Sequence, residues 1–366
     1  MLRRILTSKI VAVISCLLVL VVGIWLGGHP RYLPGPVADV FVGPESQRVA
    51  IDGLNEIHDK YYRKVGHEEL SDAALAGAVK DLDDRFSAYY SPQQYKQFSQ
   101  AINNQFSGVG TAVSGVRAGL RIETVYPGSP AQKAKVLVGD VITQANGHKL
   151  AGLGETAAVA LIKGREGTTV TLRLRRGKRT LVKHLTRATI SVPVVLSKLA
   201  NAGGKRVAYV ALSTFGPDTA HVEVAAALRK QLRRGAKGIV LDLRGNGGGL
   251  VSEAQLIASM FLKGGPIVTT KGRSVKTQTL DAVGSPIAGK VPMVVLVDGG
   301  TASAAEIVTG ALQDRHRATV VGVKTFGKGV FQEINELGNG GALDITVGQY
   351  FLPSGRNLGG PGVKQG

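Results

Sequence analysis

The stretch Val297–Ile307 (VDGGTASAAEI) joins a buried strand to a helix. Just before it, residues 291–296 (VPMVVL) are rich in β-branched side chains, which is typical of a strand buried on both faces. After the two glycines, apolar residues recur at helical intervals, so Ser303 falls in the first turn of a helix. A hydroxyl at such a corner lies beside free backbone N–H groups and is well placed to attack a carbonyl. A serine at this place can equally be a simple helix cap.

Strands and helices alternate on both sides of this turn. Apolar strand patterns and helical patterns follow one another at residues 207–212, 219–234, 238–243, 252–261 and 318–322. This order predicts an α/β core built on parallel strands, entered through a connector at residues 187–200. The glycine run Gly245–Gly249 lacks the Gly-Lys-Ser/Thr ending of a phosphate loop, and we interpret it as backbone amides beside a reaction centre.

A lysine lies between two glycines in the segment Thr325–Gln332 (TFGKGVFQ), 25 positions after Ser303. Most lysines are surface charges, but a buried lysine loses proton affinity and can act as a base near neutral pH. A serine nucleophile needs such a partner, so Ser303 and Lys328 are candidates for a catalytic pair. His316, 13 positions after Ser303, is the rival base, although its charged neighbours predict an exposed turn.

Residues 106–177 alternate short β-like runs with glycine turns, which predicts a small, partly open barrel with an edge strand and a groove. The turn at Ser107–Gly110 can present consecutive N–H groups to an anion, while an edge strand pairs with an extended peptide. This segment resembles a PDZ domain. The carboxylate-binding loop of that family is matched by Gly108, Val109, Gly110 and Thr111, its S-P-A turn by Ser129–Ala131, and its G-D-x-I strand by Gly139–Ile142. The resemblance implies a groove for the C-terminal tail of a peptide.

The order and spacing of these motifs are similar to those of the C-terminal processing peptidases, the tail-specific serine proteases of family S41. Their S-A-S-A-S-E-I motif is matched by Thr301–Ile307, and their T-F-G-K-G-x-x-Q motif is matched by Thr325–Gln332. The resemblance assigns Ser303 as the nucleophile, Lys328 as the general base and Gln332 as the group that orients the lysine.

By the same match, the backbone N–H groups of Gly248 and Ala304 would form the oxyanion hole. Three positions depart from the family pattern. Thr301 and Ala305 replace serines beside the nucleophile, which leaves a single serine in the motif. Gly247 replaces a proline, which loosens the oxyanion loop but keeps its amides.

We expect a multidomain protein of mixed α/β class: a helical N-terminal region, a small PDZ-like β-barrel, and an α/β protease core of the crotonase or Clp kind. The predicted boundaries are a membrane anchor at 1–28, a linker at 29–47, the helical region at 48–105, the PDZ domain at 106–186 and the core at 187–366. Within the helical region the pattern breaks at Leu82–Pro92. We interpret the paired Asp83 and Asp84 there as a solvated turn rather than a metal or acid–base site.

The N-terminus carries an apolar run, Ile10–Leu26, without a charged side chain and preceded by Arg3, Arg4 and Lys9. A helix of this length just spans a bilayer core, and its basic flank stays in the cytoplasm. We therefore expect an uncleaved single-pass anchor in the cell membrane, with the bulk of the chain extracytoplasmic. The formal charge of +19, from 45 Lys and Arg against 26 Asp and Glu, fits a position near anionic headgroups, and no nucleic-acid motif accompanies it.

The use of cysteine and histidine gives no support for disulfide, thiol or metal chemistry. Cys16 is the only cysteine, and the seven histidines are scattered without the spacing of a metal site. We expect neither a cofactor nor a metal.

The resemblance implies a membrane-anchored serine endopeptidase that captures the apolar C-terminal tail of a substrate with its PDZ domain and cleaves with a Ser–Lys dyad through an acyl-enzyme. The first alternative is a peptide-binding scaffold whose protease core is inactive or latent. Another is an acyl-CoA enzyme, since glycine-flanked amides also suit thioester chemistry, although the sequence has no CoA-binding feature. A second copy of the chain or an adaptor protein is left open as a further partner.

Overall fold

The structure of the protein is a computed structural model, which describes residues 15, 17–23, 25 and 45–359. Most of the predicted anchor at 1–28 and of the predicted linker at 29–47 lies outside these residues. Within the described part of the chain, no helix is both long enough and apolar enough to cross a membrane. The chain forms two compact units, Met1–Leu82 and Asp83–Gly366.

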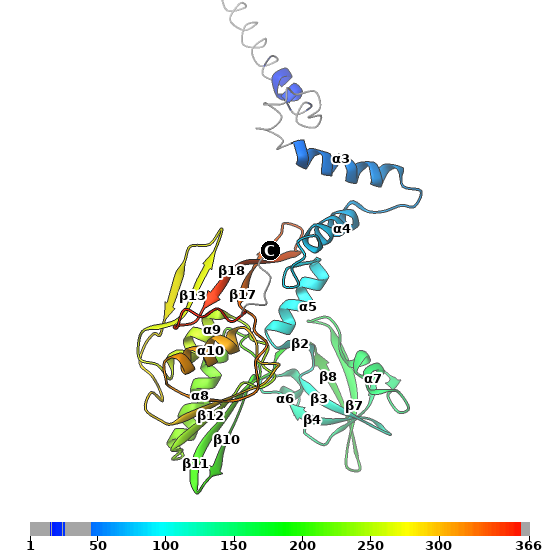
Figure 1. Ribbon diagram of the computed structural model, residues 1–366. Helices are drawn as coiled ribbons and strands as arrows, with labels where there is room; N and C mark the ends of the chain where they lie inside the picture. The colour runs from blue at the N-terminus through cyan, green and yellow to red at the C-terminus, as the bar shows by residue number, and fades with distance from the viewer. Residues whose placement is uncertain (1–14, 16, 24, 26–44, 360–366) are drawn as a thin grey trace, which may run out of the picture. The chain divides into compact units, whose positions relative to one another are not determined.

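The smaller unit contains the helices α3 (Glu45–Lys60) and α4 (His67–Lys80) (Figure 1). The helical region predicted at 48–105 therefore divides after Leu82, because its last part packs in the larger unit. That last part consists of strand β1 (Ala88–Tyr90) and helix α5 (Pro92–Ile102). A proline at the first position of α5 is well tolerated, since a helix has no partner for that N–H.

A six-stranded antiparallel sheet forms the PDZ-like region, in the order β3-β4-β5-β7-β8 with β6 paired to β5. Its elements are β3 (Thr111–Val116), β4 (Gly119–Val125), α6 (Pro130–Lys133), β5 (Val141–Ala145), β6 (His148–Lys149), α7 (Glu155–Ile162), β7 (Thr169–Arg176) and β8 (Arg179–Thr186). One face of the sheet packs on an apolar core that includes Leu120, Ile142 and Leu174, so alternate residues of β7 are buried. The predicted succession of short β-strands in this region is confirmed, and the core beneath their sheet is a finding of the structure.

The chain enters and leaves the PDZ-like region through a short antiparallel pair, β2 (Gln105–Gly108) and β9 (Ala188–Ser191). Our prediction of a connector at 187–200 is therefore wrong, because β9 and most of strand β10 (Val195–Ala202) occupy it. Strand β10 lies at the edge of its sheet, so several of its residues are exposed. Its apolar sequence pattern is weak for that reason.

The C-terminal core contains a five-stranded sheet in the order β10-β11-β12-β15-β16. Strands β11 (Lys205–Leu212), β12 (Gly238–Asp242), β15 (Met293–Val297) and β16 (Thr319–Gly322) run parallel, and β10 pairs antiparallel with β11. Helices α8 (Ala220–Arg233), α9 (Val251–Ser259) and α10 (Ala304–Asp314) lie beside this sheet (Figure 1). The predicted α/β core is confirmed. Because parallel strands end at one edge, the loops after β12 and β15 meet there.

A second sheet joins the two ends of the larger unit, in the order β1-β18-β13-β14 with β17 paired to β18. Its remaining strands are β13 (Pro266–Gly272), β14 (Gln278–Asp281), β17 (Val330–Glu336) and β18 (Ala342–Phe351). The register places Ala88 opposite Asp344, and Gln332 opposite Thr346. The segment just before the PDZ-like region therefore lies against the hairpin that follows Lys328.

Candidate active site

Ser303 occupies the corner between strand β15 and helix α10, at the N-cap position of the helix. Its backbone has φ 55° and ψ −121°, a region that residues with a side chain rarely adopt. Such a conformation costs on the order of 1–3 kcal/mol and persists only where surrounding contacts hold it. The burial of α10 along most of its length supplies part of that support.

Lys328 lies in the loop before β17, and its side chain is half-buried. Lys328 Nζ donates a hydrogen bond to Gln332 Oε1 at 2.7 Å, and Gln332 Nε2 donates in turn to Thr346 Oγ1 at 2.9 Å. Burial lowers the pKa of Lys328 below its usual value, while the nearby Asp344 and Asp84 carboxyls act in the opposite direction. Gln332 thus contacts the lysine that it was predicted to orient.

The carboxylate of Glu306, in the first turn of α10, joins the serine turn to the lysine loop. It accepts four hydrogen bonds, from the N–H groups of Ser303 (2.8 Å), Gly327 (2.7 Å) and Lys328 (3.0 Å) and from the Thr325 hydroxyl (2.6 Å). The residue is only 2% exposed, and a carboxylate so deeply buried needs donors of this number to replace its hydration. Glu306 therefore holds the candidate nucleophile and the candidate base in one site.

The two members of the predicted dyad are not hydrogen-bonded to each other. No hydrogen bond between Ser303 Oγ and Lys328 Nζ is present among the described residues. Ser303 Oγ instead accepts one from the Tyr350 hydroxyl at 3.0 Å. The backbones of the two candidate residues are therefore joined through Glu306, while their side chains are held by different neighbours.

The rival base His316 lies just beyond the far end of α10, an 11-residue helix that separates it from Ser303 by roughly 17 Å. His316 is also exposed, so it is not part of this site. Within the described residues, no group of three or more His, Cys, Asp or Glu side chains is arranged to hold a metal ion.

The two predicted oxyanion donors differ in their hydrogen bonding. Ala304 begins α10, and its N–H donates to no other group in the described part of the chain, as is usual in a first helical turn. Gly248 N–H donates to Asn246 Oδ1 at 2.9 Å, so it is engaged rather than free. A side chain at Gly248 would lie 2.7 Å from Ser303 Cβ, which explains the need for glycine there. Gly248 is thus beside the candidate nucleophile, but its amide must leave Asn246 before it can bind an oxyanion.

The turn before β1 packs against the lysine. The centroid of the Phe86 ring lies 4.9 Å from Lys328 Nζ. Asp84 accepts hydrogen bonds from Phe86 N–H at 3.0 Å and from Ser87 Oγ at 2.6 Å, and Ser87 Oγ accepts one from Thr346 N–H at 3.0 Å. Our interpretation of Asp83 and Asp84 as a solvated turn is therefore wrong for Asp84. This residue is half-buried, and its carboxyl acts to raise the pKa of Lys328.

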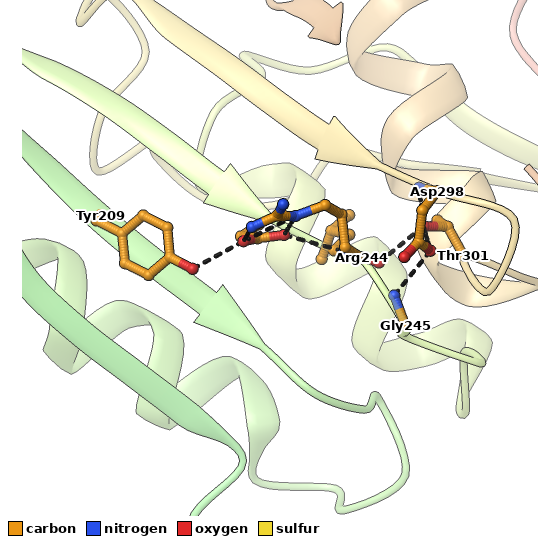
Figure 2. A network of polar contacts seen from close by, with 7 residues as sticks. Tyr209, Arg244, Gly245, Asp298 and Thr301 are labelled. Atoms are coloured by element: carbon orange, nitrogen blue, oxygen red, sulfur yellow. Dashed lines mark hydrogen bonds and ion pairs between the residues drawn. The ribbon is translucent and has the colours of Figure 1, made fainter. Parts of the chain in front are cut away.

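A network of hydrogen bonds links β11 to the carboxyl end of β12 (Figure 2). The Tyr209 hydroxyl donates to Asp242 Oδ2 at 2.7 Å, and the Arg244 guanidinium donates to both carboxylate oxygens of Asp242. Burial acts to raise the pKa of Asp242, but these hydrogen bonds outweigh it and lower that pKa below its usual value. The start of the glycine run is thereby fixed to two strands.

The same network continues to the nucleophile turn (Figure 2). Gly245 N–H donates to Asp298 Oδ1 at 2.8 Å, and the Thr301 hydroxyl donates to Leu243 O at 2.8 Å. Thr301 also accepts from Asp298 N–H at 3.0 Å and is completely buried. Thr301, which replaces a serine of the family motif, therefore fastens the glycine loop to the turn that carries Ser303.

A cavity of about 710 Å³ opens beside this network. Apolar side chains such as Val194, Val195 and Leu212 line it together with the polar Arg244 and Asp298. Its lining includes Gly245 and Asp298 but neither the predicted nucleophile nor the predicted base, so the cavity lies beside the candidate site rather than within it.

The predicted carboxylate loop of the PDZ-like region, Gly108–Thr111, joins β2 to β3. Val109 is buried in the apolar core, and its carbonyl accepts a hydrogen bond from Ala131 N–H at 2.9 Å. Gly110 has a φ of 85°, and a side chain there would lie 2.1 Å from Ser129 Cβ. The loop is therefore held against the turn that we matched to the S-P-A motif.

Sequence reasoning missed several residues around the site, and Glu306 and Tyr350 are the two that bond directly to Ser303. Glu306 stands three positions after Ser303, and a Ser-x-x-Glu pattern at a helix start is a capping signal that could have identified it. Nothing local marks Tyr350, because its role depends on the register of β18 against the rest of the second sheet.

Comparisons with known proteins place two regions of the chain in known families. Residues 206–365 match peptidase family S41, and residues 121–176 match the PDZ domain. The carboxy-terminal processing protease CtpA of Bacillus subtilis (strain 168) is 34% identical over 319 residues, which cover 86% of this chain and 67% of that protein. A probable CtpA-like serine protease of Staphylococcus epidermidis is 32% identical over 311 residues, 84% of this chain and 62% of the relative. The chain thus spans about two thirds of the length of these curated relatives, or slightly less.

Two solved structures are also similar. The photosystem II D1 C-terminal processing protease is 28% identical, with a TM-score of 0.48, and the match covers 84% of this chain and 83% of that one. The PDZ domain of a carboxy-terminal protease from Vibrio cholerae, solved in complex with a peptide, is 26% identical with a TM-score of 0.23, over 24% of this chain and 99% of that one.

Proposed function

The chain belongs to peptidase family S41, and from this premise we propose that it is a serine endopeptidase with Ser303 as nucleophile and Lys328 as general base. The observation that carries the proposal is the buried Glu306 carboxylate, which binds the N–H groups of both residues and holds them at one site. Burial lowers the pKa of Lys328, which favours the neutral amine that a base requires.

In the proposed reaction, Ser303 Oγ attacks the peptide carbonyl carbon while Lys328 Nζ takes the hydroxyl proton. Negative charge develops on the carbonyl oxygen, where the N–H groups of Ala304 and, once released from Asn246, Gly248 would donate. A single donor of this kind is typically worth about 10²- to 10³-fold in turnover. Lys328 then returns the proton to the leaving amine, and water hydrolyses the acyl-enzyme.

The dyad has to close before this chemistry begins. A neutral amine has two N–H bonds and one lone pair. Lys328 can therefore keep its hydrogen bond to Gln332 Oε1 while it directs the lone pair at the Ser303 hydroxyl. We propose that substrate binding favours this closed arrangement over the open one, which is a shift between two populations of the same site.

We also propose that the PDZ domain captures the apolar C-terminal tail of the substrate at Gly108–Thr111. Two features support this. The loop directly precedes β3, which is an edge strand of its sheet and so has an outer side where an extended peptide can pair. The PDZ domain of the Vibrio cholerae protease was solved in complex with a peptide.

Incubation of the full chain, in detergent, with an unstructured peptide that has an apolar C-terminus tests the proposed activity. We expect the wild type to cleave the peptide, Ser303→Ala and Lys328→Ala to be inactive, and His316→Ala to retain activity. An active Lys328→Ala together with an inactive His316→Ala would refute the dyad.

We propose that the chain is a single-pass membrane protein with its bulk outside the cytoplasm. The support is the apolar run Ile10–Leu26 and the basic residues before it. External protease added to intact spheroplasts should then degrade the Asp83–Gly366 unit. Complete protection until the membrane is lysed would contradict this orientation.

A latent peptide-binding scaffold is the second candidate. Two observations favour it: Ser303 and Lys328 are not hydrogen-bonded to each other, and the Gly248 amide is engaged by Asn246. Tight binding of the same peptide, equal in the wild type and in Ser303→Ala and without cleavage in either, would favour the scaffold.

A further inference from the structure

The Tyr350 hydroxyl is the direct hydrogen-bond partner of the proposed nucleophile. Tyr350 lies near the end of β18 and is completely buried. Its hydroxyl donates to Ser303 Oγ at 3.0 Å. A buried phenol needs a hydrogen-bond partner, and here that partner is the atom that would attack the substrate.

Tyr350 is held in place by its backbone and by its ring. Tyr350 N–H donates to Gly329 O at 3.1 Å, and Tyr350 O accepts from Asn357 Nδ2 at 3.0 Å. The ring stacks with that of Phe331 at a centroid distance of 6.3 Å. Gly329 follows Lys328 in the chain, so this bond ties Tyr350 to the loop that carries the lysine, just before the hairpin β17–β18.

The direction of the hydrogen bond suits a nucleophile. Because Ser303 Oγ accepts a hydrogen from Tyr350, its own hydrogen remains available for Lys328. Burial raises the pKa of Tyr350 well above its usual value, so the phenol stays protonated and remains a donor throughout the working range of pH. A donor at this position stabilises an oxygen that gains negative charge, because hydrogen bonds strengthen when the acceptor is charged.

We propose that Tyr350 is a further catalytic residue, whose hydroxyl donates a hydrogen bond to Ser303 Oγ while that oxygen loses its proton. The proposal rests on the serine peptidase function proposed above. In the step concerned, the Oγ–H proton passes to Lys328 Nζ, Oγ forms a bond to the carbonyl carbon, and the carbonyl π electrons move to its oxygen. Tyr350 keeps its own proton throughout and supplies only the hydrogen bond.

The test is Tyr350→Phe, which removes the hydroxyl and keeps the ring. We expect kcat for the apolar-tailed peptide to fall by roughly 10- to 100-fold with KM unchanged, since the variant loses a hydrogen bond to an oxygen that gains partial negative charge in the transition state. The rate of Ser303 labelling by a fluorophosphonate should fall by a similar factor, because that reaction requires only attack by Oγ.

Tyr95→Phe is the matched control. It removes a hydroxyl that donates to the exposed Glu336 at 2.8 Å, and it should leave both rates unchanged. A Tyr350→Phe protein that is folded and as fast as the wild type, or faster, would overturn the proposal. A Tyr350→Phe protein faster than the wild type would show that the tyrosine restrains Ser303 instead of assisting it. If Ser303→Ala cleaves like the wild type, the peptidase function itself fails, and this outcome is distinct from the failure of Tyr350 alone.

Discussion

Replacement of Glu306 by glutamine tests whether a buried carboxylate holds the active site together. The carboxylate accepts four hydrogen bonds, two at each oxygen. In Glu306→Gln, the single amide oxygen can accept two of these, while the amide NH₂ faces the other two donors. The substitution preserves the shape of the side chain, so the loss is specific to the charge and to one acceptor atom.

The expected loss of stability follows from those two hydrogen bonds. A hydrogen bond to a charged group contributes about 1.5–3 kcal/mol, so the loss of two lowers the free energy of unfolding by about 3–6 kcal/mol before any rearrangement. In a unit of this size each kcal/mol lowers the melting temperature by about 2–4 °C, which gives a decrease of roughly 6–12 °C at the lower limit. The rate of peptide cleavage should fall by more than this loss of stability alone explains. The reason is that Glu306 no longer joins the turn that carries Ser303 to the loop that carries Lys328.

Glu253→Gln is the matched control, since Glu253 is also 2% exposed and its carboxylate accepts from His221 N–H at 2.7 Å on helix α8. Calorimetry should find both variants less stable, and cleavage assayed well below both melting temperatures should be lost only in Glu306→Gln. A Glu306→Gln protein with the melting temperature and cleavage rate of the wild type would refute the reasoning. Equal loss of cleavage in both variants would show that Glu306 stabilises the fold in general and has no specific role in the site.

Other substitutions test the neighbours of the site. Asp344→Asn should move the rising limb of the kcat/KM pH profile to lower pH. The Asp344 carboxyl raises the pKa of Lys328, so its removal lets the lysine become neutral, and thus able to accept a proton, at lower pH. A shift of the rising limb to higher pH would contradict this. Thr301→Val should lower the free energy of unfolding in urea by about 1–3 kcal/mol, because Asp298 N–H is left unsatisfied. Thr309→Val is its control and should cost less, since the Thr309 hydroxyl only adds a second hydrogen bond to a carbonyl of its own helix.

The sequence was sufficient for the parts of the fold that depend on local pattern. Apolar runs separated by helical periods predicted the parallel core, and β-like runs between glycine turns predicted the small strand-rich region, whose likeness to a PDZ domain rests on its matched motifs. Both signals are short-range, because each element has to bury one face whatever its neighbours are. Strand β10 was missed since an edge strand buries little and its pattern of exposure is irregular.

The candidate site was predictable to the extent that it lies in motifs. Ser303, Lys328 and Gln332 were assigned from two contiguous segments, and the structure places those segments side by side. The contributions of Asp84 and Tyr350 could not be read in this way. Asp84 approaches Lys328 only because β1 pairs with β18, and no rule of local spacing predicts which strands will pair.

The closing motion of the dyad should be confined to the lysine side chain. The backbone N–H groups of Ser303 and Lys328 both bind Glu306, and release of either would leave a buried carboxylate with fewer donors, at a cost of about 1.5–3 kcal/mol for each bond. Rotation about the aliphatic bonds of Lys328 needs none of these contacts to break. A structure with an inhibitor bonded to Ser303 Oγ should therefore show Lys328 Nζ within hydrogen-bond distance of that oxygen, with all four donors still on Glu306. A closed site in which the 325–328 loop has left Glu306 would show that the backbone, and not the side chain, is the moving part.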